Sequence, residues 1–371
     1  MRVLLTGGGT GGHINPALSI AAIIRQHVPD AEFLFVGAKG RMEETLVPAA
    51  GYPLRTVEVR GFQRKLTVKN IGRNIKAAVC AVTSDSACKR ILREFRPDIA
   101  IGTGGYVSGP VLRRAAKMGI PVAVHESNAF PGVTVKLLAK YADVVMICDE
   151  AARRYLPEGA HVVVTGNPVH AGFTSMDRDE ARRQLGLDAR PLVLSVGGSL
   201  GARRINETMV QVLRRSHEQG ALQHIHATGR REYDEVAEAL KAAGVPLHGD
   251  GIWVRDYIDD MPRCMAAADV VISRCGAMTL SELPAAGKPA ILIPSPNVAE
   301  NHQYHNAMAL VRKGAALCIE EKDLTEQSLW EALEQILSHP ERQREMAAAA
   351  RRAAIPDVDE RIWAAISPLF R

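Results

Sequence analysis

Several features that mark particular protein classes are missing from this 371-residue sequence. Aromatic residues make up only 5% of it, and no stretch reaches the roughly 18 consecutive apolar residues that a membrane-spanning helix needs. The six cysteines form no CxxC and no paired spacing, which argues against a disulfide framework and against a zinc knuckle. The chain begins with a short strand-like segment, not with an apolar signal sequence. We therefore expect reduced thiols in the cytosol, and membrane contact, if any, only at the surface.

The composition is that of a globular protein, with 47% hydrophobic and 23% charged residues. The length favours two α/β domains over one. A net charge of +5 favours anionic partners such as phosphates, nucleic acid or acidic lipid. A mildly basic soluble enzyme has the same composition, so the net charge alone does not identify the partner.

Short β-branched segments alternate with amphipathic helical stretches along the whole chain. This alternation is typical of parallel sheets covered by helices on both faces. The candidate strands cover residues 3–6, 33–36, 55–59, 99–101, 122–125, 144–147 and 162–165 in the first half, and residues 192–196, 224–227, 252–254, 270–273, 290–293 and 316–319 in the second. The pattern predicts an α/β protein.

The two halves of the chain begin alike, each with a strand that leads through a glycine loop into a helix. This predicts two Rossmann-like domains whose parallel sheets face each other across a cleft. Gly166-Asn167-Pro168 ends the first series of strands, so the linker is placed there. We predict an N-terminal domain of residues 1–166, a C-terminal domain of residues 167–345, and a helical tail of residues 346–371 that packs back on the N-terminal domain.

Three glycine loops, at residues 7–13, 102–109 and 197–202, each follow a predicted strand. Unpaired amides at the start of a helix can bind phosphate or another electron-rich group. A dinucleotide site also needs an acidic residue after the second strand, where the sequence has Gly37-Ala38-Lys39. A P-loop needs Lys and then Ser or Thr where the chain has His13-Ile14. Neither a nicotinamide site nor ATP hydrolysis is expected.

The most distinctive segment is Ser-Arg-Cys-Gly-Ala-Met-Thr-Leu-Ser-Glu at residues 273–282, followed by Asn301-His302-Gln303. Taken alone, Thr279 and Glu282 fit a helix capping box. The chain also carries Gly-Gly-Thr-Gly-Gly-His, Gly-Gly-Tyr-Val-Ser-Gly, His-Glu-Ser-Asn and Gly-Gly-Ser-Leu-Gly-Ala, in that order. With these motifs the sequence closely resembles, over nearly its whole length, the MurG family of peptidoglycan N-acetylglucosaminyltransferases.

The resemblance implies a GT-B fold and an inverting transfer of N-acetylglucosamine from UDP-N-acetylglucosamine to lipid I, the undecaprenyl-pyrophosphoryl-MurNAc-pentapeptide. The product would be lipid II, used in peptidoglycan synthesis and hence in cell shape and division. In this family pattern Glu282 would accept hydrogen bonds from the ribose hydroxyls, and Ile258 would meet uracil through its backbone. The remaining implied residues are Ser199, Ala277, Met278, Thr279, Leu280 and Ser281 for the diphosphate, Gln303 and Asn128 for the sugar, Thr10, Gly11 and Gly12 for the donor–acceptor cleft, and Gly104, Gly105, Tyr106 and Ser108 for the acceptor-side loop.

The acceptor hydroxyl needs a general base, and His13 is the first candidate because an ordinary histidine has a pKa of about 6.5. A helix-capping or loop-packing role explains His13 about equally well. His125 and Glu126, at the end of another predicted strand, are the rival bases.

No metal or other cofactor is expected, and the departing diphosphate would be stabilised by helix N-termini and backbone amides. Asp177-Arg178-Asp179 has the letters of a metal-binding Asp-x-Asp motif, but it lies where a helix begins, so helix capping explains it better. Asp357-Val358-Asp359 is discounted in the same way.

Two residues depart from the family pattern. His170 follows Asn-Pro-Val where many relatives have Arg, so this chain lacks the permanent cation that Arg would supply at this point. His302 stands where some relatives have Gln, and only its neighbour Gln303 is assigned a role.

A segment at residues 65–82 combines basic and apolar residues at helical spacing. Such a segment can lie on anionic lipid, although a face packed on its own sheet has the same pattern. Its basic residues are Lys65, Lys69, Arg73 and Lys76, and its apolar residues are Leu66, Val68, Ile71, Ile75, Val79 and Val82. Because a polyprenyl acceptor requires work at a bilayer, we predict a peripheral protein on the cytoplasmic side of the bacterial cell membrane. Cell-wall synthesis proteins are candidate partners, and nucleic acid is not.

Two other functions remain open. A UDP-N-acetylglucosamine 2-epimerase would share the fold and the donor but need no lipid acceptor, and the loop at residues 104–109 argues against it. A catalytically inert sugar-nucleotide-binding partner is the second alternative, and His13, Glu126 and Glu282 argue against that.

Overall fold

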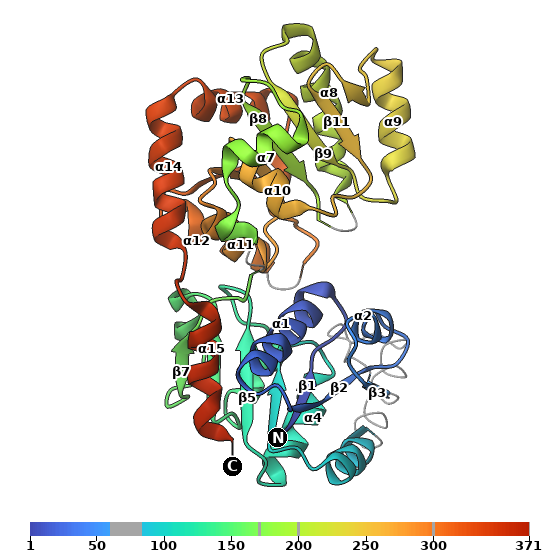
Figure 1. Cartoon of the computed structure of the whole chain (residues 1–371), viewed down its shortest axis with the longest axis vertical. Helices are drawn as coiled ribbons and strands as arrows, with labels where there is room; N and C mark the ends of the chain where they lie inside the picture. Colours follow the sequence, from blue (N-terminus) through green and yellow to red (C-terminus); the bar gives the residue numbers. More distant parts are fainter. Residues whose placement is uncertain (60–83, 170–171, 199–200, 299–300, 371) are drawn as a thin grey trace. The chain divides into compact units, whose positions relative to one another are not determined.

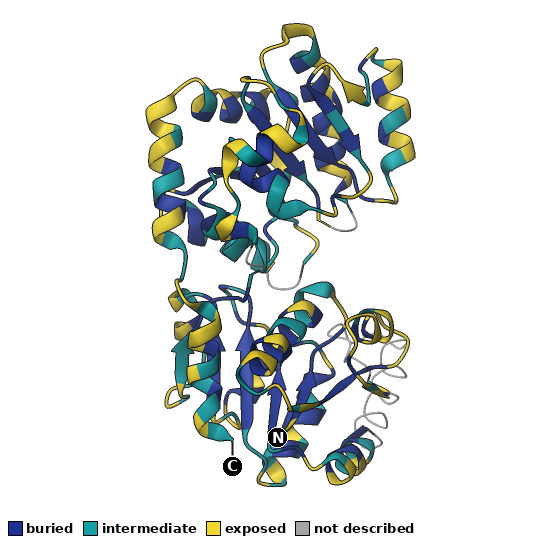
Figure 2. Cartoon of the chain, viewed as in Figure 1, coloured by how far each residue is buried: buried dark blue, intermediate teal, exposed yellow. Residues whose placement is uncertain are grey.

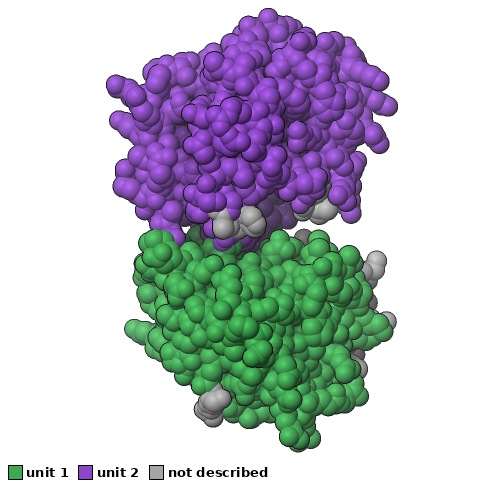
Figure 3. All heavy atoms as spheres, in the orientation of Figure 1, with its two compact units in different colours: residues 1–168, 356–371 green, residues 169–355 purple. Residues whose placement is uncertain are grey.

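The computed structural model describes residues 1–59, 84–169, 172–198, 201–298 and 301–370, which form two compact units (Figure 1). Unit 1 comprises Met1–Pro168 and Pro356–Arg371, and unit 2 comprises Val169–Ile355 (Figure 3). The chain therefore crosses between the units twice.

The sheet of unit 1 has seven strands in the order β3-β2-β1-β4-β5-β6-β7, and every neighbouring pair is parallel. The strands are β1 (Arg2–Thr6), β2 (Glu32–Ala38), β3 (Leu54–Val57), β4 (Ile99–Gly102), β5 (Val122–Glu126), β6 (Val144–Ile147) and β7 (Val162–Val164). The strand order reverses between β1 and β4. Loops that follow these two strands therefore meet at the carboxyl edge of the sheet, where ligands bind in such folds.

Helices cover both faces of this sheet, and Figure 2 shows buried strands beneath helices with exposed outer faces. The helices are α1 (Gly11–His27), α2 (Glu43–Ala49), a helix over residues 84–95, α4 (Ser108–Lys117), α5 (Val133–Leu138), η1 (Glu150–Tyr155), α15 (Val358–Ile366) and η4 (Ser367–Leu369). In α1, Ile14, Ala17 and Ile24 recur at helical spacing and are buried. This face packs on β1 and β2, so the helix start is fixed beside the end of β1.

The sheet of unit 2 has the order β10-β11-β9-β8-β12-β13-β14. All its pairs are parallel except β10 with β11. The strands are β8 (Leu192–Val196), β9 (Gln223–Ala227), β10 (His248–Gly249), β11 (Ile252–Arg255), β12 (Val270–Ser273), β13 (Ala290–Leu292) and β14 (Ala316–Cys318). The order reverses between β8 and β12, so this unit repeats the plan of unit 1.

Two clusters of buried side chains, one on each face of this sheet, hold the helices of unit 2. The helices are α6 (Gly172–Ser175), α7 (Arg178–Leu185), α8 (Arg203–Gln219), α9 (Tyr233–Ala242), α10 (Met261–Ala267), α11 (Thr279–Ala286), α12 (His302–Val311), η3 (Glu321–Asp323), α13 (Glu326–Leu337) and α14 (Pro340–Ala353). The predicted α/β class and all thirteen predicted strands are confirmed, with ends that differ by at most two residues. The two-residue edge strand β10 was not predicted.

The C-terminal tail returns to unit 1 later than the expected residue 346, because α14 buries Met346 and Ala350 within unit 2. The returning segment starts at Pro356. Its helix α15 buries Ile362 against the α1 side of the first sheet, and Trp363 stacks on His27 with ring centroids 4.4 Å apart. Among the helices that the structure describes, none is long and apolar enough to cross a bilayer.

Candidate functional site

Two loops of unit 1 interlock where the strand order reverses, one after β1 and one after β4. Gly104 and Gly105 both have positive φ, +104° and +81°, a region that glycine enters without strain. A Cβ on Gly104 would lie 2.7 Å from Nδ1 of His13, and a Cβ on Gly105 would clash with the carbonyl of Gly8. Glycine is therefore required at these positions because the two loops are in direct contact.

The ring of His13 is oriented by the β4 loop. Its Nδ1 lies 3.0 Å from the carbonyl oxygen of Thr103, while the Thr103 hydroxyl donates to the His13 carbonyl. A carbonyl can only accept, so Nδ1 of the neutral ring carries the proton and Nε2 carries the lone pair. This tautomer suits a general base that acts through Nε2.

The rival base His125 is fully buried. Its Nε2 donates to the Gly166 carbonyl at 3.0 Å, and its Nδ1 lies 3.4 Å from the Ser127 hydroxyl. Burial lowers the pKa of His125 to about 4. These contacts describe a neutral histidine that holds the end of β5 rather than one that exchanges protons with a substrate.

The other rival, Glu126, is 3% exposed and organises its own loop. Its Oε1 accepts from the backbone and side-chain nitrogens of Asn128 at 2.8 and 3.0 Å, and its Oε2 accepts from Gly132 N at 2.8 Å. Burial raises the pKa of this carboxyl, and the hydrogen bonds oppose the rise. Because both oxygens are used locally, Glu126 is a weaker candidate for the base than His13.

The residues of the β4 loop that were predicted to lie on the acceptor side have different environments. Ser108 is fully buried, and its hydroxyl lies 3.0 Å from the Thr6 carbonyl and 2.6 Å from the Gly104 carbonyl. It therefore ties the β4 loop to the end of β1. Tyr106, in contrast, is 72% exposed at the tip of the loop.

The glycine loop of unit 2 connects β8 to α8. Gly198 and Gly201 have φ of +87° and +79°, and a Cβ on Gly201 would clash with the Thr228 carbonyl at the end of β9. Ser199 lies in this loop but outside the described residues, as do His170 and the segment at residues 65–82.

Glu282 lies in the first turn of α11, which follows β12 at the switch point of the second sheet. The capping-box interpretation of Thr279 and Glu282 is wrong, because the helix begins after Met278 without a side-chain cap. Among the described residues, the half-buried Glu282 carboxylate has no hydrogen-bond or ion-pair partner. Burial alone raises its pKa to about 7. Such a carboxylate is unfavourable in the unliganded protein and is poised to accept hydrogen bonds.

Gln303, in the first turn of α12, joins two loops of the same edge. Its Oε1 accepts from Ser295 N at 2.9 Å and from Cys275 N at 3.3 Å. Two backbone donors fix which end of the amide is oxygen, so Nε2 points away from them. In the part of unit 2 that the structure describes, this Nε2 has no partner, so Gln303 offers a donor beside the loop that joins β12 to α11.

The remaining predicted donor residues of unit 2 that the structure describes lie on the same edge of the second sheet, whereas Thr10, Gly11, Gly12 and Asn128 lie in unit 1. Residues 277 and 278 precede α11, residues 279–281 form its first turn, and all five are half-buried. Ile258 is 3% exposed, in the loop between β11 and α10, with its side chain in the hydrophobic core. Only its backbone is therefore suited to contact a ligand.

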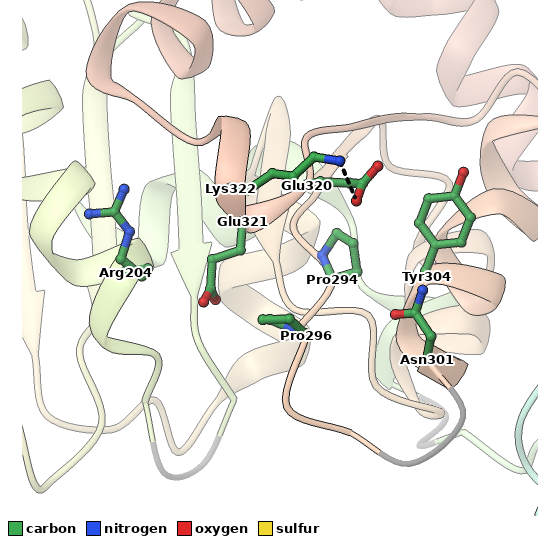
Figure 4. A pocket seen from close by; sticks show the side chains of 8 residues that line it. All are labelled: Arg204, Pro294, Pro296, Asn301, Tyr304, Glu320, Glu321 and Lys322. Atoms are coloured by element: carbon green, nitrogen blue, oxygen red, sulfur yellow. Dashed lines mark ion pairs between the residues drawn. The ribbon is translucent and has the colours of Figure 1, made fainter.

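A hollow of about 380 Å³ that was not predicted lies beside these loops within unit 2 (Figure 4). Its wall includes Tyr304, the neighbour of Gln303, and Glu321, which forms an ion pair with Arg274. The lining residues are Arg204, Pro294, Pro296, Asn301, Tyr304, Glu320, Glu321 and Lys322. Arg274 also donates to the Ile293 carbonyl, so this pair holds the β12 loop to the segment after β14.

The acidic motif at residues 177–179 caps a helix, as expected. Asp177 is the N-cap residue of α7 and accepts from Glu180 N at 2.9 Å. Asp357 precedes α15 but makes no side-chain cap. Within the described residues, no group of three or more His, Cys, Asp or Glu side chains is arranged to hold a metal ion.

Both units match domains of one enzyme family. Residues 3–147 match the glycosyltransferase family 28 N-terminal domain, and residues 192–362 match the glycosyltransferase family 28 C-terminal domain. The chain is 41% identical to the UDP-N-acetylglucosamine–N-acetylmuramyl-(pentapeptide) pyrophosphoryl-undecaprenol N-acetylglucosamine transferase of Bacillus cytotoxicus, with 100% of both chains covered. It is 42% identical to the enzyme of the same name from Acetivibrio thermocellus, covering 100% of this chain and 99% of the relative.

Solved structures agree. MurG of Acinetobacter baumannii superposes with a TM-score of 0.79 at 28% identity, covering 99% of each chain. A UDP-GlcNAc 2-epimerase from Neisseria meningitidis superposes with a TM-score of 0.65 at 14% identity, covering 99% of this chain and 100% of that one, which shows a shared fold only. The two-domain α/β architecture is thus the GT-B fold that was predicted. With relatives above 40% identity over its full length and both domains in order, the chain is a glycosyltransferase that belongs to family 28 and to its MurG group.

Proposed function

We propose that the chain transfers N-acetylglucosamine from UDP-N-acetylglucosamine to lipid I, with inversion at the anomeric carbon, and so forms lipid II. Relatives that are 41–42% identical over the full length are named for this transfer. The structural observation that carries the proposal is the half-buried carboxylate of Glu282 at the switch point of unit 2, which has no hydrogen-bond or ion-pair partner among the residues that the structure describes.

In this proposal unit 2 binds the donor. The Glu282 carboxylate accepts hydrogen bonds from both ribose hydroxyls, and the backbone of Ile258 meets uracil. Backbone amides of residues 277–281 and of the loop that contains Ser199 receive the diphosphate, helped by the positive ends of α11 and α8. The Gln303 amide donates to the sugar. Because these donors are fixed before the reaction, they stabilise the negative charge that UDP gains as it leaves.

Unit 1 supplies the acceptor side and the base. His13 Nε2 takes the proton from the acceptor hydroxyl, whose oxygen forms a bond to the anomeric carbon from the face opposite UDP. The bond to UDP breaks at the same time, and its electron pair leaves with the diphosphate. Thr10, Gly11, Gly12 and the loop with Tyr106 line the approach of the acceptor. In this proposal Asn128, whose Nδ2 donates to Glu126 Oε1 at 3.0 Å, contacts the sugar.

UDP release with and without a lipid I analogue tests this function. Release that depends on the acceptor is expected for the transferase. Release of UDP or epimerised sugar without acceptor would support an epimerase, and binding of UDP-N-acetylglucosamine without any turnover would support an inert binding partner. The epimerase has only fold similarity in its favour, at 14% identity.

Replacing Gln303 by Glu tests the proposed contact with the sugar. The carboxylate can still accept from Ser295 N and Cys275 N, but the Nε2 donor is lost. We expect affinity for UDP-N-acetylglucosamine to fall about fivefold more than affinity for UDP, since a hydrogen bond contributes about 1 kcal/mol. The new negative charge at position 303 repels the diphosphate of both ligands. The ratio of the two affinities, measured by calorimetry, therefore cancels this effect and reports the contact with the sugar. An unchanged ratio would exclude the sugar contact.

We further propose that unit 1 contacts the membrane surface. Val133 and Leu137 lie one turn apart on α5 and are 44% and 60% exposed, and Tyr141, just after the helix, is 47% exposed. Lys140 is exposed beside them. An apolar stripe next to a cation suits anionic lipid, and the segment at residues 65–82 has the same composition. This supports a peripheral position at a membrane surface, which we propose to be the cytoplasmic side of the cell membrane, with lipid I as the membrane-bound substrate.

Flotation with vesicles checks the surface. Replacing Leu137 by Ser is expected to lower the fraction bound to anionic vesicles about tenfold, because a buried leucine contributes about 1.5–3 kcal/mol. Replacing Tyr257 by Ser is the matched control, since this tyrosine is 41% exposed on unit 2. Equal loss in both variants, or no binding of the wild type to anionic lipid, would contradict the assignment.

A further inference from the structure

A buried carboxylate in unit 1 lies outside the predicted site. Glu43, the first residue of α2, is completely inaccessible to solvent. Its Oε1 accepts from Ala38 N at 2.8 Å, at the end of β2, and its Oε2 accepts from Gly9 N at 3.1 Å, in the first glycine loop. In the described part of the chain it has no cationic partner. Two backbone amides therefore provide its hydrogen bonds.

The surrounding backbone is built around this side chain. A Cβ on Gly8 would clash with Oε1 of Glu43, and a Cβ on Gly37 would lie 2.5 Å from its Cγ. Glycine is needed at both positions because the Glu43 side chain fills the space. The Glu43 side chain is therefore an integral part of the packing between the first glycine loop and the end of β2.

Glu43 lies between the first glycine loop and the end of β2, the two places where related folds bind a nucleotide. In dinucleotide-binding domains an acidic residue after the second strand binds a ribose, and the glycine loop binds a phosphate. Here the acidic residue comes from α2, and it binds the Gly9 amide itself. The carboxylate of Glu43 therefore takes one of the anion-binding amides of the loop and joins the loop to β2.

The loop held by Glu43 forms part of the surroundings of His13. Gly9 precedes Thr10, the N-cap residue of α1, and His13 lies in the first turn of that helix. The preceding Gly8 is in van der Waals contact with the β4 loop at Gly105, next to the Gly104 backbone on which the His13 ring packs. A shift at Gly9 would thus move both loops that orient His13.

We propose that Glu43 is a positioning residue, whose carboxylate fixes the first glycine loop and through it the His13 ring for proton transfer. The measurement of kcat depends on the proposed function, whereas the role of Glu43 in holding the loop does not. It concerns unit 1 alone, so donor binding by unit 2 is expected to be independent of it.

Turnover of the full-length enzyme with UDP-N-acetylglucosamine and a lipid I analogue provides the first test. Glu43→Gln keeps the shape of the side chain but presents an NH2 group to one of the two backbone amides, so one hydrogen bond is lost. We expect kcat to fall about 10- to 100-fold, while KM for the donor stays within about twofold of the wild type. Glu44→Gln, at an exposed neighbour on α2, is the matched control and should leave kcat unchanged. In Glu43→Ala, added formate is expected to restore part of kcat by replacing the lost carboxylate.

Wild-type kcat in Glu43→Gln would overturn the proposal, and so would a rise in donor KM as large as the fall in kcat. Amide hydrogen exchange separates positioning from general stability. Faster exchange is expected at residues 9–14 in Glu43→Gln, with unchanged protection at Ile20 and Ile24. Faster exchange throughout α1 and the sheet would assign Glu43 to fold stability alone. If the wild type shows no acceptor-dependent UDP release, the proposed function fails, while the exchange result still decides whether Glu43 holds the loop.

Discussion

Replacing His13 by Ala is expected to lower kcat by about 10²–10⁴-fold, the usual contribution of a general base, while the affinity for UDP stays within about twofold of the wild type. The reason lies in the hydrogen bond from Nδ1 to the Thr103 carbonyl, which leaves the lone pair on Nε2. Donor binding is assigned to unit 2, so the loss should appear in turnover alone. Steady-state kinetics with a lipid I analogue and calorimetric titration with UDP provide the two measurements.

Two further variants make the result specific to His13. His161→Ala removes an exposed histidine from the same unit and should leave kcat unchanged. Glu126→Gln should loosen the loop at residues 126–132, because one of three hydrogen bonds is lost, but should not reproduce the loss seen with His13→Ala. If Glu126→Gln abolishes turnover and His13→Ala does not, the base has been assigned to the wrong residue.

The second large effect is expected at Glu282. Hydrogen bonds to a charged group contribute about 1.5–3 kcal/mol each, so losing two of them in Glu282→Ala should weaken UDP binding by at least about 100-fold. Glu282→Gln keeps one oxygen acceptor and should lose less. Both variants should retain the fold of unit 1. Undiminished affinity in Glu282→Ala, measured by calorimetry, would remove the ribose contact from the account.

Glu282 should also make the unliganded protein less stable as the pH rises. Burial raises its pKa in the folded state to about 7 from an unfolded value of 4.5, so the folded state binds more protons between these values. Stability is therefore greatest below about pH 4.5 for this group and decreases until the pH passes 7. Glu282→Gln removes this cost, and the Tm of unit 2 at pH 8 is expected to rise relative to the wild type. A lower Tm would mean that the ionised carboxylate has a stabilising partner.

The elements that follow from local pattern were predictable. Strands such as Val144–Ile147 and Val270–Ser273 are short segments in which three of four residues are β-branched, and the structure has them with the predicted bounds. The glycine loops were identified because they follow strands. The tail boundary was misplaced, since α14 continues the helical pattern of the tail although its buried face belongs to unit 2.

Interactions between side chains and distant backbone could not be predicted from the sequence. Glu43 and Gln303 bind amides that only the fold brings to them, at Gly9 and Ala38 in one case and at Cys275 and Ser295 in the other. Thr279 and Glu282 matched a capping box by spacing, but the spacing does not tell where the helix begins. The signal that could have indicated Glu43 was Gly37, because a glycine in a strand often marks a close approach by another group.

Protons released when UDP-N-acetylglucosamine binds, measured by calorimetry in buffers of different ionisation enthalpy, report directly whether Glu282 must be ionised to bind the donor. This donor has no phosphate that titrates near neutral pH, and ribose hydroxyls need the ionised Glu282, whose pKa is about 7 in the free protein. We predict release of a large fraction of one proton at pH 6.5, decreasing to none above about pH 8.5, and no such release in Glu282→Gln. Equal proton release by wild type and Glu282→Gln, or an affinity of the wild type that does not change between pH 6 and 8.5, would contradict the claim that this carboxylate binds the donor.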